Sequence, residues 1–359
     1  MNPDDESAKC DHLQIVDKHL KGEELLFKYL STLISEKEGS IQEEHQRVML
    51  IGGGNSPGSS SSSVSGLNPF GQGTQQSTSS VCDYGMYKEL MLRFVRCLLS
   101  IISDKRYRGL LADFVKKKFV PLEESCMIIQ EYLGNQQKRL SSPKLREINE
   151  SLAILSKRQG QSERGIDLYI QVLIDLSQSE VVSELYVCDG DIAFEDPKDQ
   201  KVHVQKFDSL VSDIVKICEK VGGSEAEQDL IWSHALRAFY RVKQAVFEEV
   251  SKFQSSKQAA STHQKENKDV KRFSTFHMIR VQYFLRRMSE TVSIPRIVAL
   301  LEEINSSGTT SQPIKYQDCR KCFEDKMRTE SNHEDILVNT ATLLLKDLNA
   351  DFAILKSLH

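Results

Sequence analysis

Two helical segments separated by a short polar break lie near the middle of the chain and constrain its fold more than any other feature. In the first segment, apolar residues recur at intervals of three and four: Leu145, Ile148, Leu152 and Leu155. The second segment repeats these intervals with Ile166, Tyr169, Leu173 and Leu176. Such spacing lines one face of an α-helix. Between the segments, Gly160 is expected to end the first helix in a left-handed conformation, and Ser162 to cap the second.

An antiparallel helix pair of this kind leaves apolar side chains uncovered and is stable only when neighbours pack on it. The preceding stretch LLADFVKKKFVPLEESCMIIQEYL, residues 110–133, has the same layout, with a break at Val120-Pro121. Consecutive pairs without strands between them predict an all-α fold, an α-solenoid of stacked antiparallel helix pairs. A compact helical bundle is the structural alternative.

Helical periodicity covers most of the chain. It predicts helices at 11–47 with a break at Gly22, 84–103, 106–119, 122–134, 144–159, 163–178, 203–221, 225–253, 274–290, 295–305, 314–328 and 333–357. Pro121, Pro143 and Pro295 each fall at a predicted first turn, where the missing amide proton costs little. The best strand signal, at 184–194, predicts a hairpin around Asp189-Gly190.

Composition is typical of a helix-rich soluble protein. Of the residues 39% are hydrophobic, and 18 Gly and 8 Pro leave few turn formers for an all-β fold. A formal net charge of -4 provides no overall positive field for nucleic acid or an anionic membrane. The first residues are polar, the cysteines are scattered, and the apolar runs are far shorter than the roughly 18 residues of a membrane span. We therefore expect a cytoplasmic protein in a reducing compartment, without a transmembrane segment.

Residues 51–83 are dominated by Gly, Ser and Gln and predict a disordered linker. Three glycines, 52–54, lack the lysine and the following Ser or Thr of a phosphate-binding loop. The chain is thereby predicted to divide into N-terminal helices at 1–50, this low-complexity linker at 51–83, and an α-helical solenoid at 84–359.

Several motifs carry a resemblance to a known family. The stretch SLAILSKRQGQSERGIDLYIQVLIDL at 151–176 resembles the clathrin-heavy-chain type repeat. It is followed by DLIW at 229–232, MSETVSIPRIVALLEEI at 288–304 and EDILVNTATLLLKDLNADFAIL at 334–355. In that order, the motifs are similar to the C-terminal α-solenoid of the vacuolar protein sorting protein eight family, a subunit of the CORVET tethering complex. The resemblance covers roughly residues 105–359.

This resemblance implies a non-enzymatic scaffold subunit of a CORVET-like endosomal membrane-tethering complex in vesicle-mediated protein transport and fusion. Its implied partners are other tethering-complex subunits, bound through helical surfaces, and its location is peripheral to endosomal membranes. The family's β-propeller and RING domain have no matching residues, so its Rab contacts and RING chemistry are not carried over. We therefore expect a fragment, a truncated version or a divergent short relative. Another clathrin-repeat coat, tether or pore scaffold is the nearest alternative.

Two patterns suggest metal binding. Cys319 and Cys322 have the spacing of half a zinc site, and His333 follows eleven residues later. A closed zinc site needs four ligands and no second Cys-x-x-Cys occurs, so two reduced thiols on a helix are favoured. Residues 189–199 contain five acids but lack the ligand spacing of an EF-hand, which favours a solvated loop.

Residues 265–287 combine basic and aromatic side chains: Lys265, Lys268, Lys271, Arg272, Arg280, Arg286 and Arg287 with Phe273, Phe276, Tyr283 and Phe284. Such a pattern is compatible with a helical RNA-binding protein, the alternative from a different functional class. Helical spacing instead favours core packing of Phe276, Ile279, Tyr283 and Met288. Arg280 and Arg287 lie in or beside that face, so we expect them to pair with acids on an adjacent helix or a partner. Nucleic-acid binding is not expected.

The helix predicted at 225–253 is long and carries one apolar stripe: Trp232, Leu236, Phe239, Val246, Val250 and Phe253. The stripe favours packing against neighbouring helices, with a docking groove for a partner helix as the alternative. His234 and His277 are expected to be packed or capped rather than catalytic. No catalytic, cofactor-binding or metal-binding residue is assigned, and no cofactor is expected.

Overall fold

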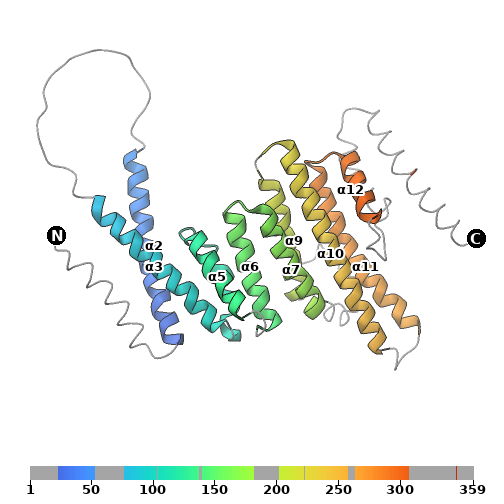
Figure 1. The fold of residues 1–359 in the computed structure, drawn as a ribbon, viewed down its shortest axis with the longest axis horizontal. Coiled ribbons are helices and arrows are strands. Elements are labelled where there is room, and N and C mark those ends of the chain that lie inside the picture. Colours follow the sequence, from blue (N-terminus) through green and yellow to red (C-terminus); the bar gives the residue numbers. More distant parts are fainter. Residues whose placement is uncertain are drawn as a thin grey trace, which may run out of the picture. The chain divides into compact units, whose positions relative to one another are not determined.

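The described part of the protein is entirely helical. A computed structural model describes residues 23–52, 77–102, 104–136, 140–181, 202–221, 223–257, 263–306 and 345. These residues form ten α-helices and no β-strand, which confirms the all-α prediction (Figure 1). The helices are α2 (Glu23–Gly52), α3 (Ser77–Ile101), α4 (Leu110–Phe114), α5 (Leu122–Gln136), α6 (Ser142–Arg158), α7 (Ser162–Leu176), α9 (Val202–Lys220), α10 (Glu225–Lys257), α11 (His263–Ser289) and α12 (Ile294–Ser306).

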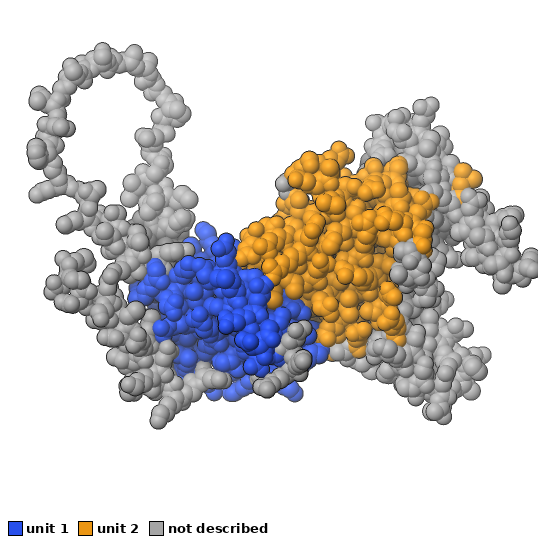
Figure 2. Space-filling view, in the orientation of Figure 1, with its two compact units in different colours: residues 1–151 blue, residues 152–359 orange. Residues whose placement is uncertain are grey.

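Two compact units make up the chain, residues 1–151 and residues 152–359 (Figure 2). We call them unit 1 and unit 2. The boundary falls inside α6, where no change of composition marks it. Helix α3 begins at Ser77, seven residues inside the predicted linker, and residues 53–76 of that linker lie outside the described residues. The predicted division at 50 and 83 follows composition and stays a prediction.

In unit 1, α3 is the central helix and contacts α2, α4 and α5. Its buried apolar side chains are Tyr87, Leu90, Met91, Leu92, Phe94, Val95, Cys97, Leu98, Leu99 and Ile101. The prediction of one helix over 106–119 is wrong. The chain instead forms a 3-10 turn, η1 (Lys105–Tyr107), and the short α4. Gly109 lies between them with φ 84°, a left-handed conformation that interrupts a right-handed helix.

The turn between α6 and α7 is built around Gly160, as predicted. Gly160 has φ 76°, and its N–H donates to the carbonyl of Lys157 at 3.2 Å. The N–H of Gln161 donates to the carbonyl of Ser156 at 2.9 Å. Together these bonds form a Schellman motif, which satisfies carbonyls at the end of α6. The prediction that Ser162 caps α7 is wrong, because Gln161 occupies the N-cap position, without a side-chain hydrogen bond.

Replacement Gly160→Ala is expected to lower the free energy of unfolding of unit 2 by about 1 kcal/mol, because a Cβ is strained in the left-handed region. Gly165→Ala is the matched control, since a Cβ there lies in ordinary contact, 3.4 Å from the nearest atom. The control is expected to be neutral or slightly stabilising. Urea unfolding followed by the fluorescence of Trp232, the only tryptophan, measures both. Equal losses in the two variants would contradict the helix-ending role of Gly160.

In unit 2, α7, α9, α10 and α11 each pack on more than one other helix. Helix α7 contacts α9 and α10, these two contact each other and α11, and α11 contacts α12. Figure 1 shows α9, α10 and α11 side by side. Aromatic rings fill the space between α10 and α11: the Phe284 ring centroid lies 5.2 Å from that of Trp232 and 5.8 Å from that of Phe239. All three side chains are at most 1% exposed, so they form the centre of the core.

Prolines and a capping box mark the starts of several helices. Pro143 and Pro295 lie in the first turns of α6 and α12, as predicted, while Pro121 directly precedes α5. At the start of α10, the N–H of Ser224 donates to Glu227 at 3.0 Å and the N–H of Glu227 donates to Ser224 Oγ at 3.4 Å. This reciprocal pair is a capping box. Helix α11 begins eleven residues before the predicted position, 274.

Several predictions fall outside the described residues. They concern the hairpin at 184–194, the acidic stretch 189–199, the helix at 314–328, and Cys319, Cys322 and His333. Of the helix predicted at 333–357, Leu345 alone is described, and it is helical. In the part of the chain that the structure describes, no helix is long and apolar enough to cross a membrane.

Candidate functional site

Helix α11 carries a buried side chain at every fourth position: Phe276, Arg280, Phe284 and Met288. This spacing puts the four on one face of the helix. The prediction of Phe276 and Met288 as core residues is confirmed, whereas Ile279 and Tyr283 are only half-buried. Arg280 lies in the middle of the buried face with a relative exposure of 0%. A charged side chain in such a place must find hydrogen-bond acceptors inside the protein.

Arg280 finds its acceptors on α9 and on its own helix. Its Nε donates to Oδ1 of Asp208 at 2.8 Å, and Nη2 donates to Oδ2 at 2.9 Å. Its Nη1 donates to the carbonyl of Phe276 at 2.9 Å, and the guanidinium lies 3.5 Å from the centroid of the Phe276 ring. The result is a bidentate ion pair stacked on an aromatic ring. The prediction that Arg280 pairs with an acid on an adjacent helix is confirmed.

Asp208 was not identified from the sequence. The sequence feature that points to Asp208 is its position directly after Phe207, which is buried, and beside the apolar stripe of α9. Burial raises the pKa of the Asp208 carboxyl, against the opposite effect of Arg280, and burial lowers the pKa of the Arg280 guanidinium. An arginine nevertheless keeps its proton in the physiological range. Each partner therefore depends on the other, because the Arg280 guanidinium is fully buried and the Asp208 carboxylate is only 15% exposed.

His277 precedes Arg280 by three residues and is neutral at physiological pH. Its ring centroid lies 5.2 Å from that of Phe239, and the residue is 1% exposed. Burial, with smaller contributions from the charges of Lys243 and Arg280, lowers the pKa of His277 to about 3. Neither ring nitrogen has a hydrogen-bond partner among the described residues. His277 thus acts as a packed ring, which confirms the prediction for this residue.

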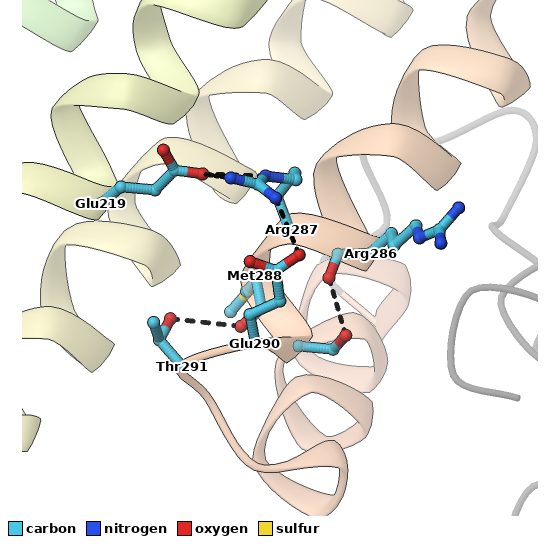
Figure 3. A network of polar contacts seen from close by, with 7 residues as sticks. Glu219, Arg286, Arg287, Met288, Glu290 and Thr291 are labelled. Carbon is cyan, nitrogen blue, oxygen red and sulfur yellow. Dashed lines mark hydrogen bonds and ion pairs between the residues drawn. The ribbon is translucent and has the colours of Figure 1, made fainter. Parts of the chain in front are cut away.

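A second ion pair joins the C-terminal ends of α9 and α11 (Figure 3). Arg287 Nε donates to Oε1 of Glu219 at 2.8 Å, and Nη1 donates to Oε1 of Glu290 at 2.8 Å. The hydrogen bond to Glu219 is the largest cause of the raised pKa of Arg287. The prediction that Arg287 pairs with an acid on an adjacent helix is confirmed. Figure 3 shows the side chain of Arg286 directed away from this network.

Three further ion pairs link α10 to helices on either side of it in the chain. Arg241 contacts Asp167 of α7 at 2.9 Å, and Asp167 also lies 3.3 Å from His234 Nε2. The two pairs to α12 are Asp229 with Arg296 at 3.0 Å and Arg237 with Glu303 at 2.9 Å. All these side chains are partly or largely exposed, so each pair contributes at most about 1 kcal/mol. His234, expected to be packed or capped, is half-buried against Asp167.

The interhelical ion pairs follow a regular order. Among the described helices α7, α9, α10, α11 and α12, each of the five arginine–carboxylate pairs given above joins a helix to the next but one. Helix α7 is paired with α10, α9 with α11, and α10 with α12. The ion pairs therefore connect α7, α10 and α12 in one series and α9 and α11 in another.

The other predicted candidates are partly described. In the stripe of α10, Trp232, Leu236 and Phe239 are buried, as predicted, while the side chains of Val246, Val250 and Phe253 lie outside the description. In the basic region, the side chains of five residues also lie outside it: Lys265, Lys268, Lys271, Arg272 and Phe273. Arg280 and Arg287 bind carboxylates of α9. A buried Arg280 has no access to a phosphate.

Chemically, the described side chains of unit 2 hold helices together. Among the described residues, no group of three or more His, Cys, Asp or Glu is placed to hold a metal ion. The free thiol of Cys218 is buried, and burial raises its pKa, so it stays a neutral apolar group. The charged residues described above are instead used in contacts between helices. The chain matches no protein-family model, no curated protein and no solved structure.

Proposed function

We propose that the protein is a non-enzymatic scaffold built on an α-solenoid of stacked helix pairs. The observation that carries this proposal is the order of five arginine–carboxylate pairs in unit 2, which connect α9 with α11, α10 with α12, and, among the described helices, α7 with α10. In a stack of helix pairs, equivalent helices of successive pairs are neighbours, and they are two apart in the chain. A stack of this kind presents an extended helical surface, which binds partners by area rather than by reactive groups.

Within this class, the resemblance at 151–176, 229–232, 288–304 and 334–355 favours one role. The protein is a CORVET-like subunit of an endosomal membrane-tethering complex and acts in vesicle-mediated protein transport and fusion. It binds other tethering-complex subunits through its helical surfaces and reaches endosomal membranes through them, as a peripheral cytoplasmic protein. Another clathrin-repeat coat, tether or pore scaffold is the alternative that shares the same architecture.

Affinity capture of the tagged full chain from cells tests this function. Subunits of an endosomal tethering complex are the expected co-purifying proteins, and Arg280→Ala, which removes the buried ion pair of unit 2, is expected to reduce their recovery. Arg237→Ala is the matched control, because its ion pair with Glu303 is exposed; it is expected to retain the partners.

Two results would contradict the tethering role. Capture of ribonucleoproteins alone would favour the RNA-binding alternative, provided that the purified chain also binds RNA at low salt, where phosphate contacts are strongest. Recovery of subunits from a coat or a nuclear pore would keep the scaffold architecture but place it in another assembly.

A further inference from the structure

Three lysines of unit 2 lie where α9 packs against the turn between α6 and α7. Lys157 is in the last turn of α6, while Lys216 and Lys220 are four residues apart on α9 and share one face of that helix. Gly165, near the start of α7, lies next to both helices. A Cβ at this position would be 3.5 Å from the backbone nitrogen of Lys157 and 3.7 Å from Cδ1 of Ile217. Because Ile217 directly follows Lys216, α9 passes the end of α6 at the level of these lysines.

We call Lys157, Lys216 and Lys220 the lysine cluster, and it has an excess of positive charge. Lys216 Nζ lies 3.7 Å from Oδ1 of Asp213, which is too long for a hydrogen bond. Among the described residues, no carboxylate lies within ion-pair distance of Lys157 or Lys220. Burial lowers the pKa of Lys157, Asp213 opposes this effect, and the charges of Lys220 and Lys216 lower the pKa further. The three ammonium groups therefore repel one another, and a single carboxylate does not neutralise them.

Helix ends account for part of this arrangement. The partial negative charge at a helix C-terminus favours lysines in the last turn, where Lys157 and Lys220 lie. This effect falls off within the last turn, and Lys216 is one turn earlier in α9. Lys216 and Lys220 are exposed, so they reach a ligand in solution, whereas packing holds the half-buried Lys157 in place. An anion that contacts all three would offset their repulsion.

A phosphate group matches the lysine cluster better than a carboxylate does. Each ammonium group has three N–H donors, and a phosphate has three acceptor oxygens and up to two negative charges, so it accepts hydrogen bonds from several lysines at once. A carboxylate has one charge and fits the planar fork of an arginine, as Asp208 fits Arg280. The cluster contains lysines alone, which bind phosphate as point charges.

We propose that the lysine cluster is a binding site for a multiply charged phosphate group, carried either by a soluble phosphate compound or by a phosphorylated lipid headgroup. Lys216 and Lys220 bind the phosphate from one face of α9, and Lys157 binds it from the end of α6. The bound phosphate supplies the negative charge that the cluster lacks. This inference goes beyond the proposed scaffold function, because it adds a ligand whose binding requires no other protein.

The test measures the binding of inorganic pyrophosphate to the full chain by isothermal titration calorimetry at low salt. The unchanged chain is expected to bind, with an affinity that falls as salt screens the charges. Lys216→Gln together with Lys220→Gln is expected to weaken binding at least about tenfold, because two charge-assisted hydrogen bonds are lost. Lys157→Gln alone is expected to weaken it as well.

Co-sedimentation with vesicles distinguishes the two sources of the phosphate. Phosphatidylcholine vesicles are used with and without phosphatidylinositol bisphosphate. Binding only to vesicles that contain the phosphorylated lipid, reversed by pyrophosphate, would assign the site to a lipid headgroup. Binding of pyrophosphate without binding of either vesicle would assign it to a soluble phosphate compound.

The matched control is Arg237→Gln together with Arg241→Gln. These two arginines are also exposed and four residues apart, and the control removes the same charge, but each is paired with a carboxylate. The control is expected to bind pyrophosphate as the unchanged chain does. Equal binding by the unchanged chain and the Lys216→Gln, Lys220→Gln variant would overturn the inference, as would an unchanged chain that binds neither pyrophosphate nor vesicles.

Thermal unfolding provides a second measurement on the same proteins. Pyrophosphate is expected to raise the unfolding temperature of the unchanged chain and of the arginine control, but not that of the double lysine variant. Without pyrophosphate at low salt, the double lysine variant is expected to be at least as stable as the unchanged chain, because repulsion of Lys157 is relieved. A less stable variant, with no effect of pyrophosphate on the unchanged chain, would show that the lysines only compensate the helix ends. These measurements include no other protein, so their outcome is separate from that of the affinity capture.

Discussion

Replacement of Arg280 by alanine is expected to lower the free energy of unfolding of unit 2 by about 3–5 kcal/mol, the usual cost of removing one partner of a buried ion pair. Arg280 is fully buried, and its guanidinium binds both carboxylate oxygens of Asp208, whose side chain is 15% exposed. The variant leaves the Asp208 carboxylate without its counter-charge in a site with little water. Urea unfolding followed by Trp232 fluorescence measures the effect, because this single tryptophan is 0% exposed in unit 2.

Two control variants separate the buried charge from the loss of any ion pair. Arg237→Ala breaks the exposed pair with Glu303 and is expected to cost less than about 1 kcal/mol. Combining Arg280→Met with Asp208→Leu removes both charges and is expected to recover most of the stability, because apolar side chains of similar volume often replace a buried pair without loss. A cost below about 1 kcal/mol for Arg280→Ala would show that the pair is solvated rather than buried.

Acid is expected to destabilise unit 2 through His277. The pKa of this residue is about 3 in the folded protein and ordinarily about 6.5, so between these values the unfolded chain binds the proton more tightly. The stabilisation of the folded state is fully present above pH 6.5 and is lost as the pH falls toward 3. The expected slope approaches about 1.4 kcal/mol per pH unit below pH 6.5, which gives a loss of about 2 kcal/mol between pH 6.5 and pH 4.5.

The variant His277→Leu isolates this effect from the titration of carboxyl groups elsewhere. Leucine has no proton to gain, so the difference in unfolding free energy between this variant and the unchanged chain is expected to grow as the pH falls. Above pH 7 the variant is expected to be as stable as the unchanged chain or more stable, because no hydrogen bond of the imidazole is lost. A difference that is constant from pH 7.5 to pH 4.5 would show that the pKa of His277 is the same in the folded and unfolded states.

Local features of the sequence predicted most of the helices and one of their turns. Helix α5 was expected at 122–134 and ends at Gln136, and α9 was expected at 203–221 and covers Val202–Lys220. Gly160 takes the left-handed conformation that its place between two helices predicted. These features depend on hydrogen bonds and side chains only a few residues apart, which a short window of sequence contains.

The prediction of one helix at 106–119 was wrong because two local features and one contact with a distant residue interrupt the helix. The apolar spacing there fits a helix, but Asp104 accepts a hydrogen bond from the N–H of Arg106, and Gly109 adopts a positive φ. In addition, Glu147 of α6 accepts a hydrogen bond from the N–H of Leu111 at the start of α4. This last contact spans 36 residues and depends on packing within unit 1. A periodicity of apolar residues contains no information about it.

For the candidate site, the sequence indicated the arginines but not their partners. Arg280 and Arg287 stood out because each lies in or beside the apolar face of a helix, where a charge needs a partner. Asp208 and Glu219 are 72 and 68 residues away from them. Neither the depth at which Arg280 is buried nor the stacking on Phe276 follows from a helical period, because both depend on how α9, α10 and α11 pack.

The sequence by itself determined that the described part of the chain is helical, where most of its helices begin and end, and which face of each is apolar, because helix formation depends on residues three and four apart. Only the tertiary structure decided which helices lie together, which acids pair with Arg280 and Arg287, and that α2 packs on α3 with Glu38 bound to Lys117. These contacts join residues tens of positions apart. Several alternative packings would bury the same apolar faces, and specific contacts between distant side chains select among them.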